Sequence, residues 1–205
     1  MISIVDYGLG NIRAFANAYK RLRLPFEVVS TADRLRAATK IILPGVGAFD
    51  EAMLRLRRSG MRAVLDELVV TKRVPVLGIC VGMHLLGDSS DEGVAQGLGW
   101  VPGSVKRLEI ERLSHRTHLP HMGWNQVRPR RRHELFRGVE SVEGFYFLHS
   151  YHFRCAADEH VLADTQYGAR FSCALNRGNV YGVQCHPEKS HGNGLQLLRN
   201  FGEIQ

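Results

Sequence analysis

The sequence predicts an α/β fold: an open, mostly parallel sheet flanked by helices, with an antiparallel extension. Through the first half, up to Leu86, short apolar runs alternate with amphipathic helical patterns, and this alternation favours a parallel sheet covered on both faces. The second half is richer in strand-like segments and ends in one helical pattern. No linker rich in Pro, Gly or Ser and no internal repeat separates the halves, so we expect residues 1–205 to form a single domain.

The predicted elements begin with a strand, a helix and a second strand. Ile2 to Val5 is an apolar run of the length of a buried strand. Glycines at positions 8 and 10 then turn the chain, and Asn11 is placed to cap a helix. The apolar residues of that helix recur every three or four positions, at Ile12, Phe15, Tyr19 and Leu22. Pro25 ends the helix, and Phe26 to Val29 is the next predicted strand.

The alternation then continues. Lys40 to Leu43 predicts a third strand, closed by Pro44-Gly45. Phe49 to Val70 predicts one or two helices with a break near Ser59-Gly60. A fourth strand at Val74 to Ile79 and a helix at Val81 to Leu86 follow.

The second half is predicted to contain four strands and a closing helix. Arg177-Gly178-Asn179 has the composition of a hairpin turn, and Leu195, Leu198 and Phe201 have helical spacing. The predicted strands are Val101 to Leu108, Phe145 to His149, Phe171 to Leu175 and Asn179 to Gln184.

The composition is that of a soluble globular protein, with 44% hydrophobic and 23% charged residues. The first residues do not resemble a signal peptide, and no apolar stretch approaches the ~18 residues of a membrane-spanning helix. The four cysteines form no C-x-x-C pair and are too sparse for a disulfide scaffold. We therefore expect a reducing, cytoplasmic location and no membrane partner.

The net charge of +7 raises the question of an anionic partner. The most concentrated basic stretch, Arg128 to Arg132, contains no aromatic side chain on which a nucleic-acid base would stack. Charge runs of this kind usually form solvated loops. We expect a surface loop here and no nucleic-acid partner.

A candidate nucleophile lies in Gly78-Ile79-Cys80-Val81-Gly82, between a predicted strand and a predicted helix. A nucleophile at a tight strand-to-helix turn needs small flanking residues, because the turn crowds the backbone. The start of a helix also favours a thiolate. The alternative is a buried cysteine that only packs, and the flanking elements favour catalysis over it.

A candidate base and its orienting acceptor follow the last predicted strand, in His186-Pro187-Glu188. His186 falls at the end of that strand, where active sites collect in open parallel sheets. Glu188 is close enough in sequence to hold the other ring nitrogen, as an activated nucleophile requires. Pro44-Gly45-Val46-Gly47, at the end of another strand, has the small residues of an oxyanion turn, although alone it reads as an ordinary turn.

Together these motifs resemble the class I (triad) glutamine amidotransferases and, more narrowly, the glutaminase subunits of imidazole glycerol phosphate synthase. The resemblance spans nearly the whole chain. Besides the two catalytic motifs, it is carried by residues 6–11 (DYGLGN), 44–49 (PGVGAF), 121–125 (HMGWN), 145–151 (FYFLHSY) and 182–184 (GVQ).

The resemblance implies hydrolysis of glutamine to glutamate and ammonia, with no cofactor and no metal. Cys80 would attack the side-chain amide, His186 would move protons, and Glu188 would orient His186. Backbone groups at Gly47 and Val81 would form the oxyanion hole. His84, Glu92, Ser150 and Tyr151 would line the glutamine site.

The same resemblance implies a heterodimer with a (β/α)₈-barrel cyclase that receives the ammonia and makes imidazole glycerol phosphate in histidine biosynthesis. Asn11, Trp124, Tyr146 and Lys189 match positions that face or gate that interface.

Two residues depart from the pattern: His84 stands where the family usually has Gln, and Cys185 stands where it favours an aromatic residue. The first departure puts glutamine affinity or pH dependence in question, and the second adds a thiol beside the base that either packs or is open to oxidation.

Two other motifs are weak. Residues 8–13 begin like a dinucleotide fingerprint, but Arg13 replaces its third glycine. His115, His118 and His121 have the spacing of a helical metal site, which Pro120 interrupts. His149 and His152 lie in one strand-like run, and their separation of three points them to opposite faces, which favours structural roles.

Three other functions remain open. A paralogous glutaminase would supply ammonia to another acceptor, such as a surface-polysaccharide sugar. A non-catalytic subunit that only activates its partner would not need Cys80, His186 and Glu188. A cysteine peptidase of the same fold would not need the 121–125 and 145–151 blocks.

Overall fold

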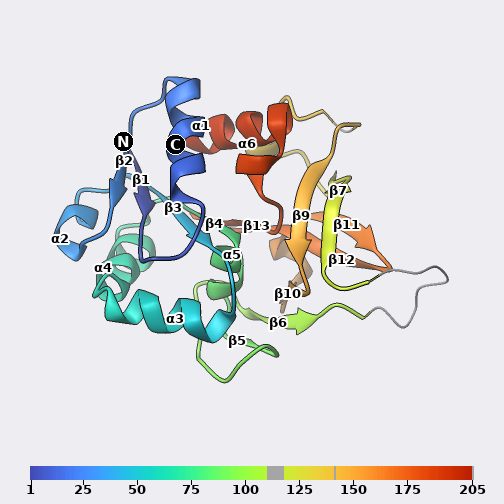
Figure 1. The fold of residues 1–205 in the computed structure, drawn as a ribbon, viewed down its shortest axis with the longest axis horizontal. Coiled ribbons are helices and arrows are strands. Elements are labelled where there is room, and N and C mark those ends of the chain that lie inside the picture. The colour runs from blue at the N-terminus through green and yellow to red at the C-terminus, as the bar shows by residue number, and fades with distance from the viewer. Residues whose placement is uncertain (110–117, 141, 205) are drawn as a thin grey trace.

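The computed structural model describes residues 1–109, 118–140 and 142–204, and its centre is an eight-stranded sheet (Figure 1). Five neighbouring strands are parallel and three antiparallel strands extend one edge. In sheet order they are β2 (Phe26–Val29), β1 (Ile2–Val5), β3 (Lys40–Gly45), β4 (Val76–Cys80), β13 (Val180–Val183), β12 (Ala169–Arg177), β11 (Val161–Tyr167) and β8 (Arg128–Pro129).

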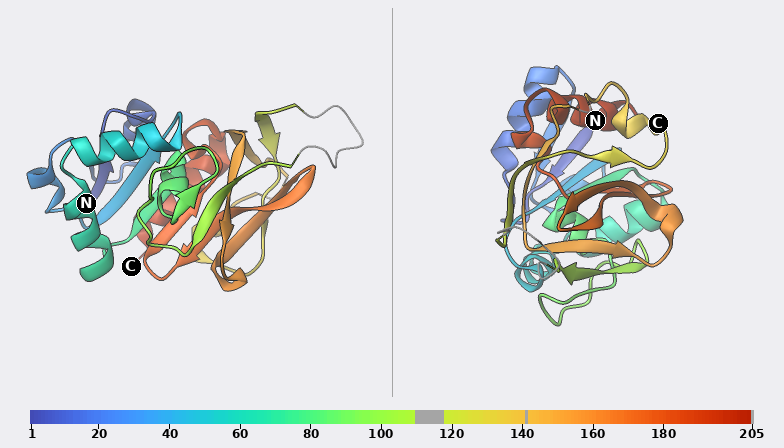
Figure 2. Two further views of the ribbon diagram at one scale, coloured as in Figure 1. Left: turned by 90° about the horizontal axis from the view of Figure 1, so that it is seen from below. Right: turned by 90° about the vertical axis from the view of Figure 1, so that its right-hand side faces the viewer.

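Helices cover both faces of the parallel strands, which makes three layers (Figures 1 and 2). The long helices α1 (Ile12–Leu22) and α6 (His191–Glu203) lie together on one face, where the Tyr19 hydroxyl donates to the Leu198 carbonyl at 3.4 Å. The opposite face carries α3 (Phe49–Arg58), α4 (Arg62–Asp66) and α5 (Val81–Leu85). α4 runs on into a wider turn at Glu67–Thr71, and the short α2 (Ala32–Leu35) follows β2.

Two small sheets flank the antiparallel half. β10 (Tyr151–Cys155), β6 (Gly103–Arg107) and β5 (Ser89–Ser90) form one, and β7 (His121–Asn125) pairs with β9 (Phe145–His149) in the other. Three short 3₁₀ turns lie at Glu134–Phe136, Asp158–His160 and Pro187–Lys189. The last of these carries part of the candidate site.

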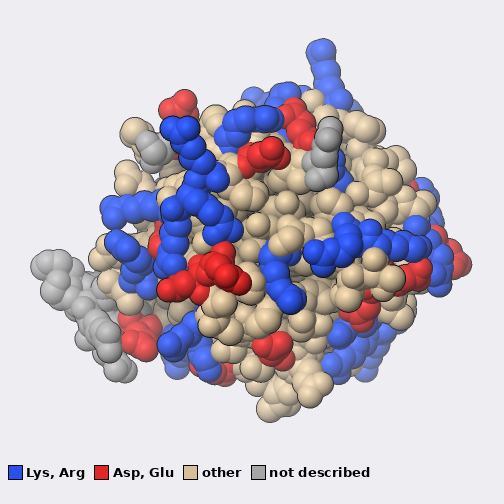
Figure 3. Space-filling model, turned by 180° about the vertical axis from the view of Figure 1, so that it is seen from behind, with Lys and Arg blue, Asp and Glu red and all other residues tan. Residues whose placement is uncertain are grey.

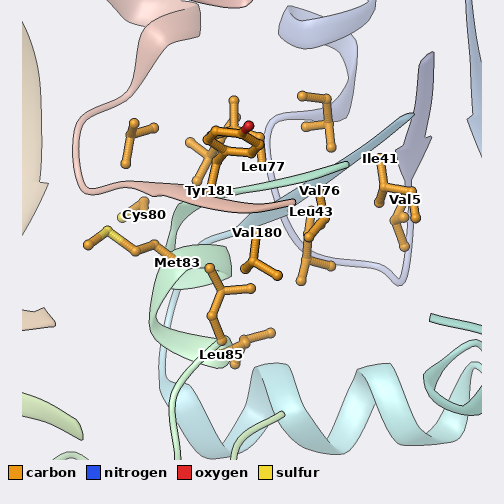
Figure 4. Packing of buried hydrophobic residues seen from close by; sticks show 14 of the residues in the cluster. Val5, Ile41, Leu43, Val76, Leu77, Cys80, Met83, Leu85, Val180 and Tyr181 are labelled. Atoms are coloured by element: carbon orange, nitrogen blue, oxygen red, sulfur yellow. The ribbon is translucent and has the colours of Figure 1, made fainter. Parts of the chain in front are cut away.

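The core is built on the parallel strands, and the side chains of β1, β4 and β13 are buried on both faces of the sheet. Figure 4 shows these apolar side chains above and below β3, β4 and β13, with Cys80 at the end of β4. Leu43 and Leu77, from the two central strands, are fully buried. A rigid, close-packed centre therefore supports the strand ends from which the candidate catalytic residues project.

The predicted fold class is confirmed, and the structure refines its details. The hairpin turn at Arg177-Gly178-Asn179 joins β12 to β13 as expected. The strands expected within 101–108 and 145–149 do form, but as β6 and β9 they pair in the small sheets rather than in the main one. β3 extends through Pro44 and Gly45, because both residues pair with the end of β4. Asn11 occupies the cap position of α1 without a side-chain capping bond.

The basic stretch is less loop-like than expected. Arg128 and Pro129 form the edge strand β8, and Arg130 donates to the carboxylate of Asp164 at 2.6 Å and to that of Asp158 at 3.3 Å. On the face drawn in Figure 3, basic side chains gather in several separate groups with acidic ones among them. Within the described ranges, no helix is long and apolar enough to cross a membrane.

Candidate active site

Cys80 is the last residue of β4 and immediately precedes α5. Its backbone has φ 55° and ψ −113°, a conformation that residues with a side chain rarely adopt. A strained backbone of this kind persists only where contacts with the surrounding structure hold it in place, and it occurs most often at functional sites. The turn holds the sulfur at the carboxyl end of the central strand, as the sequence predicts.

The small residues around Cys80 are required by close backbone approach. A Cβ on Gly82 would overlap the Leu43 carbonyl oxygen of β3, and a Cβ on Gly78 would lie 2.6 Å from the Gly82 carbonyl oxygen. These contacts press the first turn of α5 against β3 and β4. The G-x-C-x-G spacing is therefore a packing requirement of the turn that presents the sulfur.

His186 follows β13, the parallel neighbour of β4, and its side chain is paired with Glu188. The Nδ1 atom of His186 lies 2.9 Å from Oε1 of Glu188, and both side chains are almost completely buried. Nε2 is then the ring nitrogen available to Cys80. The His186 backbone N–H donates to the Tyr146 carbonyl at 2.8 Å, which ties the base to β9.

The charge environment favours a protonated His186. Burial alone lowers the pKa of this imidazole, but hydrogen bonds and charge interactions with Cys80 and Glu188 raise it to about 10. A protonated His186 presents an N–H group and a positive charge to the Cys80 sulfur. The carboxylate of Glu188 stabilises the imidazolium and fixes its orientation.

The turn after β3 faces the nucleophile. Gly45 pairs in register with Cys80 across the sheet, and Val46 and Gly47 line the same cavity as the sulfur. Gly47 has φ +84°, which favours glycine at this position, and open space lies where a Cβ would be. The turn after β3 and Val81 therefore line the cavity that holds the sulfur.

A cavity of about 250 Å³ brings most of the predicted site residues together. Glu92 is held there by the Phe49 backbone N–H, which donates to its Oε2 at 2.9 Å. The cavity is lined by Val46, Gly47, Cys80, Val81, His84, Glu92, Leu148, His149, Ser150, Tyr151, His186 and Lys189. All the residues expected in the triad, the oxyanion hole and the glutamine site are in this set except Glu188, which lies behind His186.

His84 is fully buried on α5, and its Nε2 lies 2.8 Å from Oε1 of Gln184. Burial, together with repulsion from His152, outweighs the Gln184 hydrogen bond and lowers the pKa of His84 to about 4, so its ring is neutral at pH 7. Gln184 in turn donates from Nε2 to the Cys80 sulfur at 3.9 Å. Gln184 belongs to the 182–184 motif, but the sequence alone indicates no role for its side chain.

Cys185, the second departure, is buried, and burial raises the pKa of its thiol well above the ordinary range, with nearby Cys173 adding to the effect. Such a cysteine stays a neutral thiol and packs as a small apolar residue. Each of the four cysteines is free.

Three of the four predicted interface residues form one cluster. Trp124 on β7 is 46% exposed and packs edge-on against Tyr146 of β9, with ring centroids 6.4 Å apart. The Nζ atom of Lys189 lies 5.5 Å from the centroid of the Tyr146 ring. Because Lys189 also lines the catalytic cavity, this cluster connects the surface with the site. Asn11, at the start of α1, makes none of these contacts.

Two other histidines, His121 and His149, are hydrogen-bonded to each other. His121 Nδ1 lies 2.9 Å from His149 Nε2, and His149 Nδ1 donates to the Tyr151 carbonyl at 2.8 Å. The expectation of one strand holding His149 and His152 is wrong, because the chain passes from β9 into β10, and so into another sheet, at Ser150. His115 lies outside the described residues. Among those described, no group of His, Cys, Asp and Glu is placed to hold a metal.

Comparison with known proteins gives one consistent family. The glutamine amidotransferase class-I family matches residues 3–204. Imidazole glycerol phosphate synthase subunit HisH of Bdellovibrio bacteriovorus is 59% identical, and that of Leptospira interrogans is 48% identical, each alignment covering 100% of both chains. A solved glutamine amidotransferase superposes with a TM-score of 0.72 at 20% identity, covering 98% of this chain and 96% of its own. The structure of PurLQS from Thermotoga maritima gives a TM-score of 0.68 at 18% identity, with 98% and 95% covered.

Proposed function

This chain belongs to the class I glutamine amidotransferases and, within them, to the HisH subunits of imidazole glycerol phosphate synthase, and we propose that it hydrolyses glutamine with Cys80, His186 and Glu188. It is thus the glutaminase subunit of an enzyme of histidine biosynthesis. The observation that carries the residue assignment is the strained Cys80 turn beside the His186–Glu188 pair on the adjacent strand. The chain is proposed to work as one amidotransferase domain, which its continuous apolar core supports.

The first half of the reaction releases ammonia. The Cys80 thiolate attacks the side-chain carbonyl carbon of glutamine, and the carbonyl oxygen becomes an oxyanion that backbone N–H groups at Gly47 and Val81 stabilise. His186 donates its Nε2 proton to the amide nitrogen, so the C–N bond breaks and ammonia leaves. A γ-glutamyl thioester on Cys80 and a neutral His186 remain.

The second half regenerates the enzyme. Neutral His186 takes a proton from water, and the hydroxide attacks the thioester carbon. The C–S bond then breaks, which releases glutamate and restores the thiolate–imidazolium pair. Glu188 stabilises the positive ring whenever His186 is protonated, and it holds the tautomer that presents Nε2 to the sulfur.

The same cavity supports the proposed orientation of glutamine. Glu92 offers a carboxylate oxygen for the substrate's α-ammonium group, while Ser150 and Tyr151 offer donors for its α-carboxylate. His84 forms part of the wall near the sulfur. A cavity of about 250 Å³ suits one amino acid of this size.

The partner is proposed to be a (β/α)₈-barrel cyclase that docks on Trp124, Tyr146 and Lys189. An exposed tryptophan beside a tyrosine is typical of an interface anchor. The contact between Lys189 and Tyr146, next to the cavity, supports passage of ammonia at this point. Asn11 is proposed to contribute from the start of α1, and a cytoplasmic location follows from the biosynthetic role.

Glutaminase turnover with and without the purified cyclase and its ribonucleotide substrate tests the proposal. We expect strong stimulation by both together and poor turnover by the isolated chain, because the turn at Gly47 needs repositioning when the partner binds. Cys80→Ser in the complex serves as the blank.

Full activity of the isolated chain would contradict that coupling. Absence of stimulation, with Cys80 still modified by a glutamine-analogue electrophile, would retain the glutaminase chemistry and assign the ammonia to another acceptor.

A further inference from the structure

Two buried side chains, neither of them part of the triad, form a chain of hydrogen bonds that ends on the nucleophile. His84 Nε2 lies 2.8 Å from Gln184 Oε1, and Gln184 Nε2 lies 3.9 Å from Cys80 Sγ. Gln184 is 0% exposed and His84 is 2% exposed, so water does not compete for these groups. These hydrogen bonds join α5 to the residue that follows β13, at the wall of the cavity that holds the sulfur.

The protonation state of His84 decides which atoms donate and which accept in these two hydrogen bonds. Its ring is neutral at pH 7 because burial lowers its pKa to about 4, so it carries one N–H group. Nδ1 has no hydrogen-bond partner within the described part of the chain. A buried N–H without an acceptor costs more than a bare lone pair, so the proton belongs on Nε2. His84 therefore donates to Gln184 Oε1.

This donation fixes which end of the Gln184 amide faces the sulfur. With its oxygen held by His84, the amide turns its NH₂ group to Cys80. Besides His186, the sulfur also contacts the Leu148 carbonyl oxygen at 3.9 Å, which can accept from a thiol but repels a thiolate. If the amide were reversed, the thiolate would face two oxygens. His84 excludes that arrangement.

We propose that His84 is a positioning residue that acts through Gln184: it holds an N–H donor against the Cys80 sulfur and so stabilises the thiolate. The inference rests on the proposed role of Cys80 as nucleophile. It gives the His84 departure a function in addition to its place in the cavity wall, because the contact with Gln184 acts on the sulfur. A glutamine side chain at position 84 also carries an N–H donor and is able to do the same.

Other titratable groups also act on these two residues and are present in every variant compared. Any two of the variants compared below therefore differ only at the substituted residues. The groups are His149 and His152 around His84, and His186, Tyr7 and Cys185 around Cys80.

The test is the pH dependence of Cys80 alkylation by iodoacetamide, which reports the thiolate without using the glutamine contacts. Peptide mass spectrometry separates Cys80 from the other thiols, whose burial raises their pKa, to about 12 for Cys155 and well above the ordinary range for Cys173 and Cys185. His84→Leu removes the donor, and we expect the midpoint to rise by on the order of one pH unit. At a pH below both midpoints, this slows alkylation roughly 10-fold.

Three further variants show whether the shift in the midpoint comes from the contact between His84 and Gln184. His84→Gln should restore the native midpoint, because its amide donates to Gln184 Oε1. Gln184→Leu removes the N–H group without adding a charge, so it should raise the midpoint at least as much as His84→Leu. His133→Gln, a partly buried histidine beside Tyr181, should change nothing.

An unchanged midpoint in folded His84→Leu, or an equal rise in His84→Gln, would overturn the proposal. If His84→Leu fails to fold, Gln184→Leu against His84→Gln decides the same question. Retained glutamine hydrolysis by Cys80→Ser would instead refute the proposed nucleophile. The two failures are therefore distinguishable.

Discussion

At the scale of single residues, the site depends on placing one sulfur in an unfavourable backbone conformation. Cys80 has a positive φ, and the glycines on either side leave room for the turn that imposes it. The base and its orienting carboxylate lie one strand away. For these three side chains, the chemical group therefore matters more to the site than the apolar surface that the residue buries.

Cys80→Ser should abolish glutamine hydrolysis while the fold and partner binding remain. A serine hydroxyl stays protonated beside His186, so we expect a loss on the order of 10⁴-fold or more in kcat. Ammonia release is the measurement, with circular dichroism and partner titration as checks on folding. Substantial residual hydrolysis would refute the assignment of the nucleophile.

Glu188→Gln should reduce kcat roughly 100-fold less than His186→Ala does, because an orienting group contributes less than the base itself. Steady-state kinetics of the two variants in the complex would show this. Equal losses would indicate that Glu188 moves a proton directly or holds the local structure.

Glu188→Gln should also change the pH dependence of stability. The pKa of His186 is raised to about 10 in the native state, against about 6.5 in the unfolded chain. Its stabilising contribution is therefore complete below about pH 6.5 and is lost as the pH rises to about 10. Removing the carboxylate should make this decline in the free energy of unfolding shallower, as urea titrations across this range would show. Glu159→Gln, at a carboxylate whose side chain is 81% exposed, should leave the decline unchanged.

At the scale of elements, three parallel strands end side by side, and each leads to part of the proposed site. β3 leads to the turn at Gly47, β4 ends at Cys80, and β13 leads to His186. In open sheets, the ends of adjacent parallel strands form the crevice where ligands bind. The contact between α5 and β3 fixes the distance between the oxyanion turn and the sulfur.

Gly82→Ala should destabilise the protein by about 1–3 kcal/mol or more, because its Cβ would overlap the Leu43 carbonyl oxygen. Gly192→Ala, near the start of α6, is the matched control, because a Cβ there would meet only the Glu143 carboxylate, at an ordinary contact distance of 3.5 Å. We expect that control to be neutral or stabilising by up to about 1 kcal/mol. Thermal unfolding distinguishes the two, and equal melting temperatures would contradict the packing argument.

At the scale of the whole molecule, the candidate interface and the catalytic cavity share a boundary. Trp124 lies on the surface, Tyr146 binds the His186 backbone, and Lys189 reaches from the cavity wall to the Tyr146 ring. A partner that contacts Trp124 is thus connected to the base through Tyr146. This arrangement would carry the effect of a partner at the proposed interface to the proposed catalytic residues.

Trp124→Ala should weaken binding of the cyclase subunit about 10-fold or more, as loss of an aromatic anchor does. Calorimetric titration measures the affinity, and turnover at saturating partner should be affected less. Val94→Ala, at a side chain that is 96% exposed, is the control. Unchanged affinity in Trp124→Ala would exclude this surface as the docking site.

The fold class, most elements of the first half and the candidate triad could be predicted from the sequence alone. These features depend on neighbours in the chain: hydrophobic periodicity, glycine and proline at turns, and a cysteine or histidine directly after a strand. Strands β7 and β11 were not predicted, because neither carries a clear alternation of apolar and polar residues.

Which segments pair and which polar groups meet became clear only from the folded chain. β6 and β9 were predicted as strands, but their partners depend on long-range packing, which placed them in separate small sheets. His84 and Gln184 are 100 residues apart in the chain, and Gln184 and Cys80 are 104 apart. A hydrogen bond between such residues leaves no local pattern, because the sheet and α5 bring them together only when the core has packed.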